Sequence, residues 1–163
     1  MVSSRTEQHA FLLRSIGERL KQRPVKQIIK QPGMRAVYRV TIFYHDRRAL
    51  DSVATLYDRH TVAPELTITY QGAFREKLLK YSISRIRYED FLSKLHHLRF
   101  DHLRDQPCLP QYQNVDLWLI ERAAGTFIRS IIVAPETAQG VHAEIVKTIK
   151  THLPEALRLI AQE

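Results

Sequence analysis

The stretch from residue 115 to residue 134, VDLWLIERAAGTFIRSIIVA, carries the strongest structural signal in the sequence. It predicts two β-strands, 115–122 and 127–134, joined by a short turn with the sequence AAGT. Residues 117–120 (LWLI) are apolar without alternation, which is typical of a strand that is covered on both faces. We therefore expect a hairpin whose first strand lies in the middle of a sheet.

Upstream of this hairpin, the segment 37–44 (VYRVTIFY) predicts another strand. Its alternation gives one apolar or aromatic face, made of Tyr38, Val40, Ile42 and Tyr44. Arg39 and Thr41 are the polar positions on the opposite face. The segments 66–71 (LTITYQ) and 78–87 (LLKYSISRIR) predict a second hairpin that turns at a glycine.

Helical spacing of apolar residues occurs in four segments, which are 4–20, 25–29, 88–103 and 140–161. Ser4 and Glu7 have the spacing of a capping box at the start of the first helix. Pro24 stands in the first turn of the short second helix, and a Pro-Gly pair ends it. Pro154 predicts a kink or a break in the last helix.

Residues 47–59 fit more than one structure. The apolar residues with helical spacing are Leu50, Val53, Ala54 and Tyr57, and for this reason we expect a helix, capped by Asp46. With that helix, the middle of the chain has the order βαββαβ, which is the ferredoxin-like order, extended by an edge strand and terminal helices. If the segment is a loop or a strand, the order becomes αβββαββα, which resembles that of secretion-chaperone-like folds. This resemblance is one of topology and implies no function.

Length and composition predict a single α+β domain spanning residues 1–163. We expect about five largely antiparallel strands packed by helices, with residues 1–33 forming a basic helical segment. A chain of 163 residues suits one hydrophobic core. Its 44% hydrophobic and 26% charged residues exclude a largely disordered or collagen-like chain.

The expected location is the cytoplasm. The longest uncharged apolar run, 130–135, is far shorter than the roughly 20 residues that cross a bilayer, so we expect no membrane association. Residues 1–10 (MVSSRTEQHA) lack the apolar core of a signal peptide. The single cysteine, Cys108, excludes an internal disulfide framework and a cysteine-rich zinc site.

Positive charge is concentrated at the start of the chain. Residues 1–48 contain eleven Lys or Arg residues against three acidic residues, and this excess of eight equals the net charge of the whole chain, +8. Such a field attracts polyanions, including nucleic acid. The candidate polyanion-binding residues are Arg19, Lys21, Arg23, Lys26, Lys30, Arg35 and Arg39.

The sequence contains no convincing catalytic pattern. His96, His97, Asp101 and His102 lie close together, but on a helix His97 and His102 point roughly 140° apart. His97, Asp101 and His102 therefore cannot all converge on one metal ion without an outside ligand. We interpret the histidines as partly buried residues at a helix edge, with Asp101 orienting one ring. Nothing in the sequence around Cys108 indicates an activated nucleophile, and no glycine spacing forms a phosphate-binding loop. We therefore expect no catalytic residue, no metal site and no cofactor.

Two functional hypotheses lead. In the first, the chain is a non-catalytic binding or adaptor module that contacts a protein partner or a second copy of itself. In the second, the basic segment contacts the phosphates of DNA or RNA without reading the sequence. An enzyme that uses the histidine cluster at 96–102 is a distant third.

Overall fold

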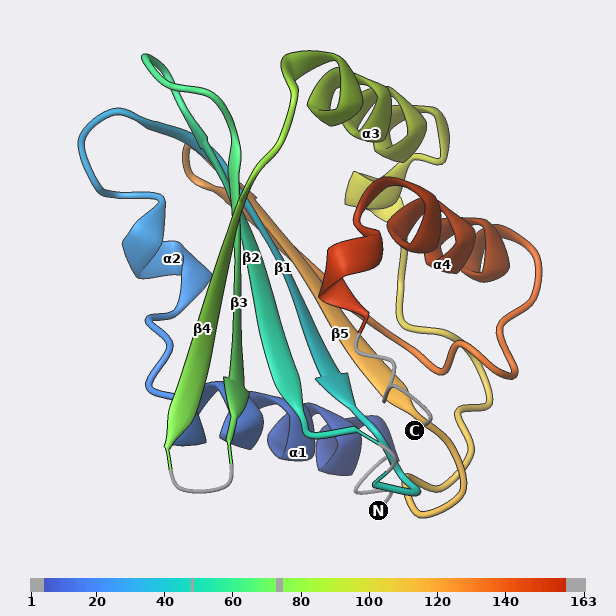
Figure 1. Cartoon of the computed structure of the whole chain (residues 1–163). Coiled ribbons are helices and arrows are strands. Elements are labelled where there is room, and N and C mark those ends of the chain that lie inside the picture. Colours follow the sequence, from blue (N-terminus) through green and yellow to red (C-terminus); the bar gives the residue numbers. More distant parts are fainter. Residues whose placement is uncertain (1–4, 48, 73–74, 158–163) are drawn as a thin grey trace.

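Six antiparallel strands form one sheet through the centre of the molecule, in the order β4-β3-β2-β1-β5-β6 (Figure 1). The computed structural model describes residues 5–47, 49–72 and 75–157. The strands are β1 (Met34–Phe43), β2 (Ser52–Arg59), β3 (Glu65–Gln71), β4 (Glu76–Ser82), β5 (Leu117–Ala124) and β6 (Phe127–Val133). The expected α+β class with an antiparallel sheet is confirmed, with one strand more than the expected five or so.

Helices cover both faces of this sheet (Figure 1). One face packs against α3 (Arg85–His97) and α4 (Val141–His152), and the other against α1 (Arg5–Arg19) and the single turn α2 (Val25–Ile28). Two short 3₁₀ turns, Phe100–His102 and Pro154–Ala156, follow α3 and α4. None of the helices in the described ranges is both long and apolar enough to span a membrane.

The neighbouring interior strands β1 and β5 are buried on both faces, as the uninterrupted apolar run in 117–120 predicts. Trp118 and Ile120 join the core under α3 and α4, whereas Leu117 and Leu119 pack against α1. A large apolar side chain contributes about 1.5–3 kcal/mol when it is fully buried. Burial on both sides of these strands therefore anchors the three layers to one another.

The β5–β6 hairpin turns at Gly125 and Thr126, since Ala124 pairs directly with Phe127. Gly125 has a φ of 60°, as the first central residue of a type II′ turn requires. Glycine adopts this left-handed conformation without strain. The predicted turn is thereby confirmed, although β5 runs two residues further into it than expected.

The helix expected over residues 47–59 is wrong, because residues 52–59 form β2 in the interior of the sheet. Val53 and Tyr57 lie on the α1 and α2 face, and Ala54 and Leu56 lie on the opposite face. Because both faces are covered, apolar residues occur on each, and their combined spacing imitates a helix. Neither the βαββαβ nor the αβββαββα order is therefore correct, since four strands precede α3.

The other boundaries differ by a few residues. The fourth strand ends at Ser82 rather than at residue 87, and α3 begins at Arg85, where the Ser84 hydroxyl caps it by accepting a hydrogen bond from the Arg87 amide (3.2 Å). The predicted break at Pro154 is confirmed, since α4 ends at His152 and a 3₁₀ turn follows. The expected cap at Ser4 lies outside the described residues.

Candidate functional site

Two of the seven predicted polyanion-binding residues form ion pairs with acidic side chains. Arg19 donates a hydrogen bond to the buried Asp51 (2.8 Å), and Arg35 lies 3.9 Å from the buried Asp58. Their charges are partly neutralised within the fold. Lys26 and Lys30 differ, because both are exposed on or just after α2.

Arg39 is buried in the sheet rather than displayed on the surface. Its Nε donates to the Thr55 hydroxyl (3.0 Å), and its Nη1 donates to the backbone carbonyl of Arg23 (2.7 Å). Burial lowers the pKa of the Arg39 guanidinium, an effect opposed by Glu121, which lies directly across on β5. Arg39 thus ties the segment between α1 and α2 to the sheet, and its Nη2 is buried without a hydrogen-bond partner in the described structure.

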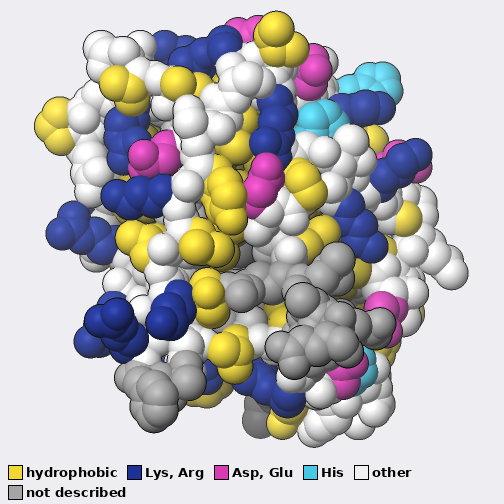
Figure 2. All heavy atoms as spheres, viewed as in Figure 1, with side chains coloured by type: hydrophobic (Ala, Val, Ile, Leu, Met, Phe, Trp, Pro, Cys, Tyr) yellow, Lys and Arg dark blue, Asp and Glu magenta, His cyan; other side chains and the backbone are white. Residues whose placement is uncertain are grey.

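Lys21 and Arg23 lie in that tied segment and line a groove of about 490 Å³. The floor of the groove comes from β1 to β4, and its other cationic residues are Arg39, Arg59 and Lys80. Glu65 is the one acidic residue that lines the groove within the described ranges, and its carboxylate is 4.0 Å from Arg59. Figure 2 shows Lys and Arg side chains gathered on this side of the sheet, at the left of the view.

Arg59 and Lys80 are members of the groove that sequence reasoning missed. Lys80 of β4 pairs with Thr67, Thr67 with Thr55, and Thr55 with Arg39, so one row of side chains crosses four strands. This row of side chains can be recognised only when the register of β2 is known. Because the sequence predicts a helix for residues 47–59, it does not reveal the row.

The three histidines of the predicted cluster are exposed rather than partly buried, and the cluster is divided between two surfaces. His96, Asp101 and His102 line a cavity of about 310 Å³ together with Arg99 and Arg122. The Asp101 carboxylate accepts hydrogen bonds from Arg122 (2.9 and 3.1 Å) rather than orienting a histidine ring. His97 lies instead in a shallow depression next to His152.

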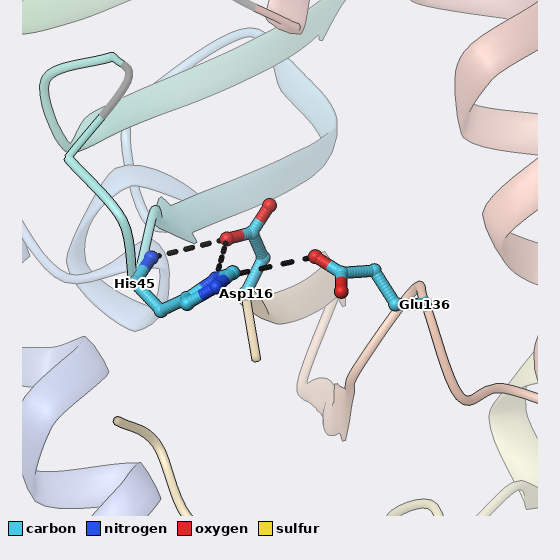
Figure 3. Close-up of side chains that lie close together, drawn as sticks. All are labelled: His45, Asp116 and Glu136. Carbon is cyan, nitrogen blue, oxygen red and sulfur yellow. Dashed lines mark hydrogen bonds and ion pairs between the residues drawn. The ribbon is translucent and has the colours of Figure 1, made fainter. Parts of the chain in front are cut away.

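A second polar cluster joins the ends of three strands (Figure 3). His45 follows β1, Asp116 precedes β5 and Glu136 follows β6. Asp116 accepts hydrogen bonds from the His45 amide (3.0 Å) and from its ring Nδ1 (2.7 Å), and Glu136 lies 4.0 Å from the same nitrogen.

One potential ligand atom from each of these three residues lies within 4.8 Å of the others. An imidazole nitrogen with two carboxylate oxygens is a donor set that suits zinc or manganese. The His45–Asp116 separation of 2.7 Å is that of a hydrogen bond. This cluster therefore links the end of β1 to the start of β5. The residues are up to 91 positions apart, which explains why no spacing in the sequence pointed to them.

The edge strand β4 is the most open element of the sheet. All seven of its residues are exposed, and they include Leu78 (56% exposed), Leu79 (37%) and Tyr81 (36%). Hydrophobic side chains consequently lie on both faces of this strand, beside the Lys and Arg side chains that Figure 2 shows on the same side of the molecule. The strand is paired with β3 along one edge, and its other edge ends the sheet.

Neither the comparison with known protein families nor that with curated proteins finds a match to this chain. The functional assignment therefore depends on the surfaces described above. Strand β4 exposes large apolar side chains at the end of the sheet, and the groove concentrates positive charge.

Proposed function

We propose that this chain is a non-catalytic binding module that acts through protein–protein contact and pairs with a second copy of itself along β4. The observation that carries the proposal is the exposure of all seven residues of this edge strand. An edge strand presents a row of backbone N–H and C=O groups that another strand can pair with. Strand addition of this kind is a common mode of protein recognition.

A long edge strand in a monomer is normally protected by charges, prolines or bulges. Strand β4 has no proline, and its register with β3 runs without a shift from Glu76 to Ser82. Lys77 and Lys80 are its cationic residues, and apolar residues separate them. The strand is therefore regular and partly apolar, which favours a partner strand over open solvent.

The sequence of β4 suits antiparallel pairing with its own copy. In a two-fold arrangement centred on Leu78, the two Leu78 side chains meet, and each Glu76 lies opposite Lys80 of the second copy. Directly opposed charges of opposite sign stabilise a strand pair. Two-fold registers centred on Lys77 or on Lys80 would instead place two lysines directly opposite each other, which is unfavourable. The pattern of charges thus favours the register centred on Leu78 over these two.

The test measures the mass of the protein in solution by light scattering across a concentration series. The wild-type chain should form a dimer, and Leu78→Glu should give a monomer, because it opposes two carboxylates at the centre of the pair. Ile86→Glu is the matched control, since Ile86 is 75% exposed on α3, outside β4, and this variant should remain dimeric. A monomeric wild-type chain, or a dimer that survives Leu78→Glu, would refute the proposal.

A further inference from the structure

We propose that the basic groove between the α1–α2 segment and strands β1 to β4 binds the phosphate groups of single-stranded nucleic acid. This activity is separate from pairing along β4, since the groove is complete within one chain. Lys21, Arg23, Arg59 and Lys80 form the cationic lining above the buried Arg39.

The first argument is the convergence of charge from separate elements. Five cationic residues of the groove come from the α1–α2 segment, β1, β2 and β4, and they oppose one acidic residue, Glu65. A concave surface lined by one sign of charge focuses the electric field and raises the local concentration of the opposite charge. The groove is therefore suited to a polyanion.

The second argument is that part of this lining is fixed in place. Arg39 hydrogen-bonds the Arg23 carbonyl and the Thr55 hydroxyl, so the segment that bears Lys21 and Arg23 is held against the sheet. Cations that are held in position before binding lose less conformational freedom when a ligand arrives. Arg39 is in this sense a positioning residue.

The third argument is the chemistry of the groove floor. Thr67 and Thr69 line it, and both are buried (8% and 7% exposed), with no hydrogen bond from their hydroxyls within the described structure. A hydroxyl that reaches the groove can donate to a phosphate oxygen. Tyr57 also lines the groove, with the Arg59 guanidinium 4.7 Å from the centre of its ring. Arg59 therefore covers this face of the ring, and its guanidinium plane is itself a surface on which an unpaired base can stack.

The size of the groove suits a ligand of the dimensions of a nucleotide, which is the repeating unit of a single strand. Its volume of about 490 Å³ lies within the range of roughly 300–1,000 Å³ typical of small-ligand sites. A free nucleotide offers the same phosphate chemistry as a strand. The two ligands are distinguished by affinity, because a strand continues past the groove to further cations on α2 and a nucleotide does not.

The experiment measures binding by fluorescence anisotropy of labelled single-stranded RNA and DNA over a series of salt concentrations. A labelled duplex and a labelled mononucleotide serve as the other probes. The wild-type chain should bind single strands most tightly, and log K should fall linearly with log salt, by about 0.7 for each phosphate contact. The double variant Lys21→Gln, Arg23→Gln should make this slope shallower by about 1.4, for RNA and DNA alike.

Two variants with the same change in charge serve as controls. Lys147→Gln, Lys150→Gln removes two exposed cations from α4 on the opposite face, and the affinity should be unchanged. Lys26→Gln, Lys30→Gln removes two exposed cations near the groove that do not line it, and the slope should change less than with the groove variant. Unchanged thermal unfolding of each variant excludes misfolding as the cause.

Four results would overturn the inference. They are the absence of binding at low salt, an affinity that salt does not change, an equal loss in the groove variant and the α4 variant, and binding of the duplex or the mononucleotide as tightly as the single strand. Leu78 and Lys80 line the groove and also belong to β4, so pairing along that strand and binding in the groove share two residues. The tested residues Lys21 and Arg23 lie outside β4, so the groove variant leaves the pairing strand unchanged and the two proposals can fail separately.

Discussion

The sheet has a covered half, which consists of the interior strands β1, β2, β3 and β5 with the helices packed on them, and an open half, which is the edge strand β4 with the groove beside it. Strands β1 and β5 lie between helices on both faces, and most of their side chains are buried. Strand β4, which β3 and β2 separate from β1, has every residue exposed. The covered half holds the fold together, and the open half bears the edge strand and part of the basic groove. The binding surfaces that we propose thus lie where the helices leave the sheet uncovered.

The largest expected effect tests this difference with one substitution placed in each half. Leu56→Ala in β2 removes a side chain that is 1% exposed in the main core and should lower the free energy of unfolding by about 2–5 kcal/mol. Leu78→Ala in β4 should change it by less than about 0.5 kcal/mol. Urea unfolding measures both, at a concentration where the chain is monomeric. Similar losses would show that β4 is covered in the single chain.

A smaller effect is expected from a matched pair of tyrosines. The buried Tyr88 hydroxyl donates a hydrogen bond to the buried Asp58 (2.8 Å), and its burial, reinforced by Tyr38 and Asp58, raises its pKa so that it keeps its proton. Tyr88→Phe should therefore lower the free energy of unfolding by about 1–2 kcal/mol. Tyr81→Phe on the exposed β4 should leave it nearly unchanged. Equal effects of the two substitutions would contradict the contrast between the halves.

The sequence predicts the covered half better than the open half, with one exception that has a physical cause. The strands at 37–44 and 115–134 are recognisable because β-branched and aromatic residues form continuous or strictly alternating patterns there. Strand β2 was mistaken for a helix because both of its faces are covered while Ser52, Thr55 and Asp58 interrupt its apolar run. Buried polar residues of this kind depend on partners that are distant in the sequence.

The sequence predicts the candidate sites only where their residues are close together in the chain. The density of cations around Lys21 and Arg23 is visible in the sequence, and both residues do line the groove. Arg59 and Lys80 reach the same groove through strand register, which the sequence pattern did not specify. The burial of Arg39 was hidden for a similar reason, since its partners Thr55 and Glu121 lie on neighbouring strands.

The smallest expected effect concerns the pH dependence of stability in the covered half. Burial raises the pKa of the Glu121 carboxyl above its ordinary value of 4.5, although Arg39 and Arg14 oppose the shift. The folded chain therefore holds this proton more tightly than the unfolded chain does. The resulting stabilisation is complete below the unfolded pKa and is lost as the pH rises through the folded pKa.

Urea unfolding of the wild-type chain and of Glu121→Gln over a range of pH from acidic to neutral measures this contribution. The difference in unfolding free energy, wild type minus variant, should decrease as the pH rises, because the glutamine cannot ionise. A constant difference would mean that the attraction of Arg39 balances the burial of the carboxylate, and one that grows with pH would mean that the attraction outweighs it. In that case the row of side chains from Glu121 to Arg39 would behave as a stable ion pair, and the covered half would resemble the open half in tolerating charge.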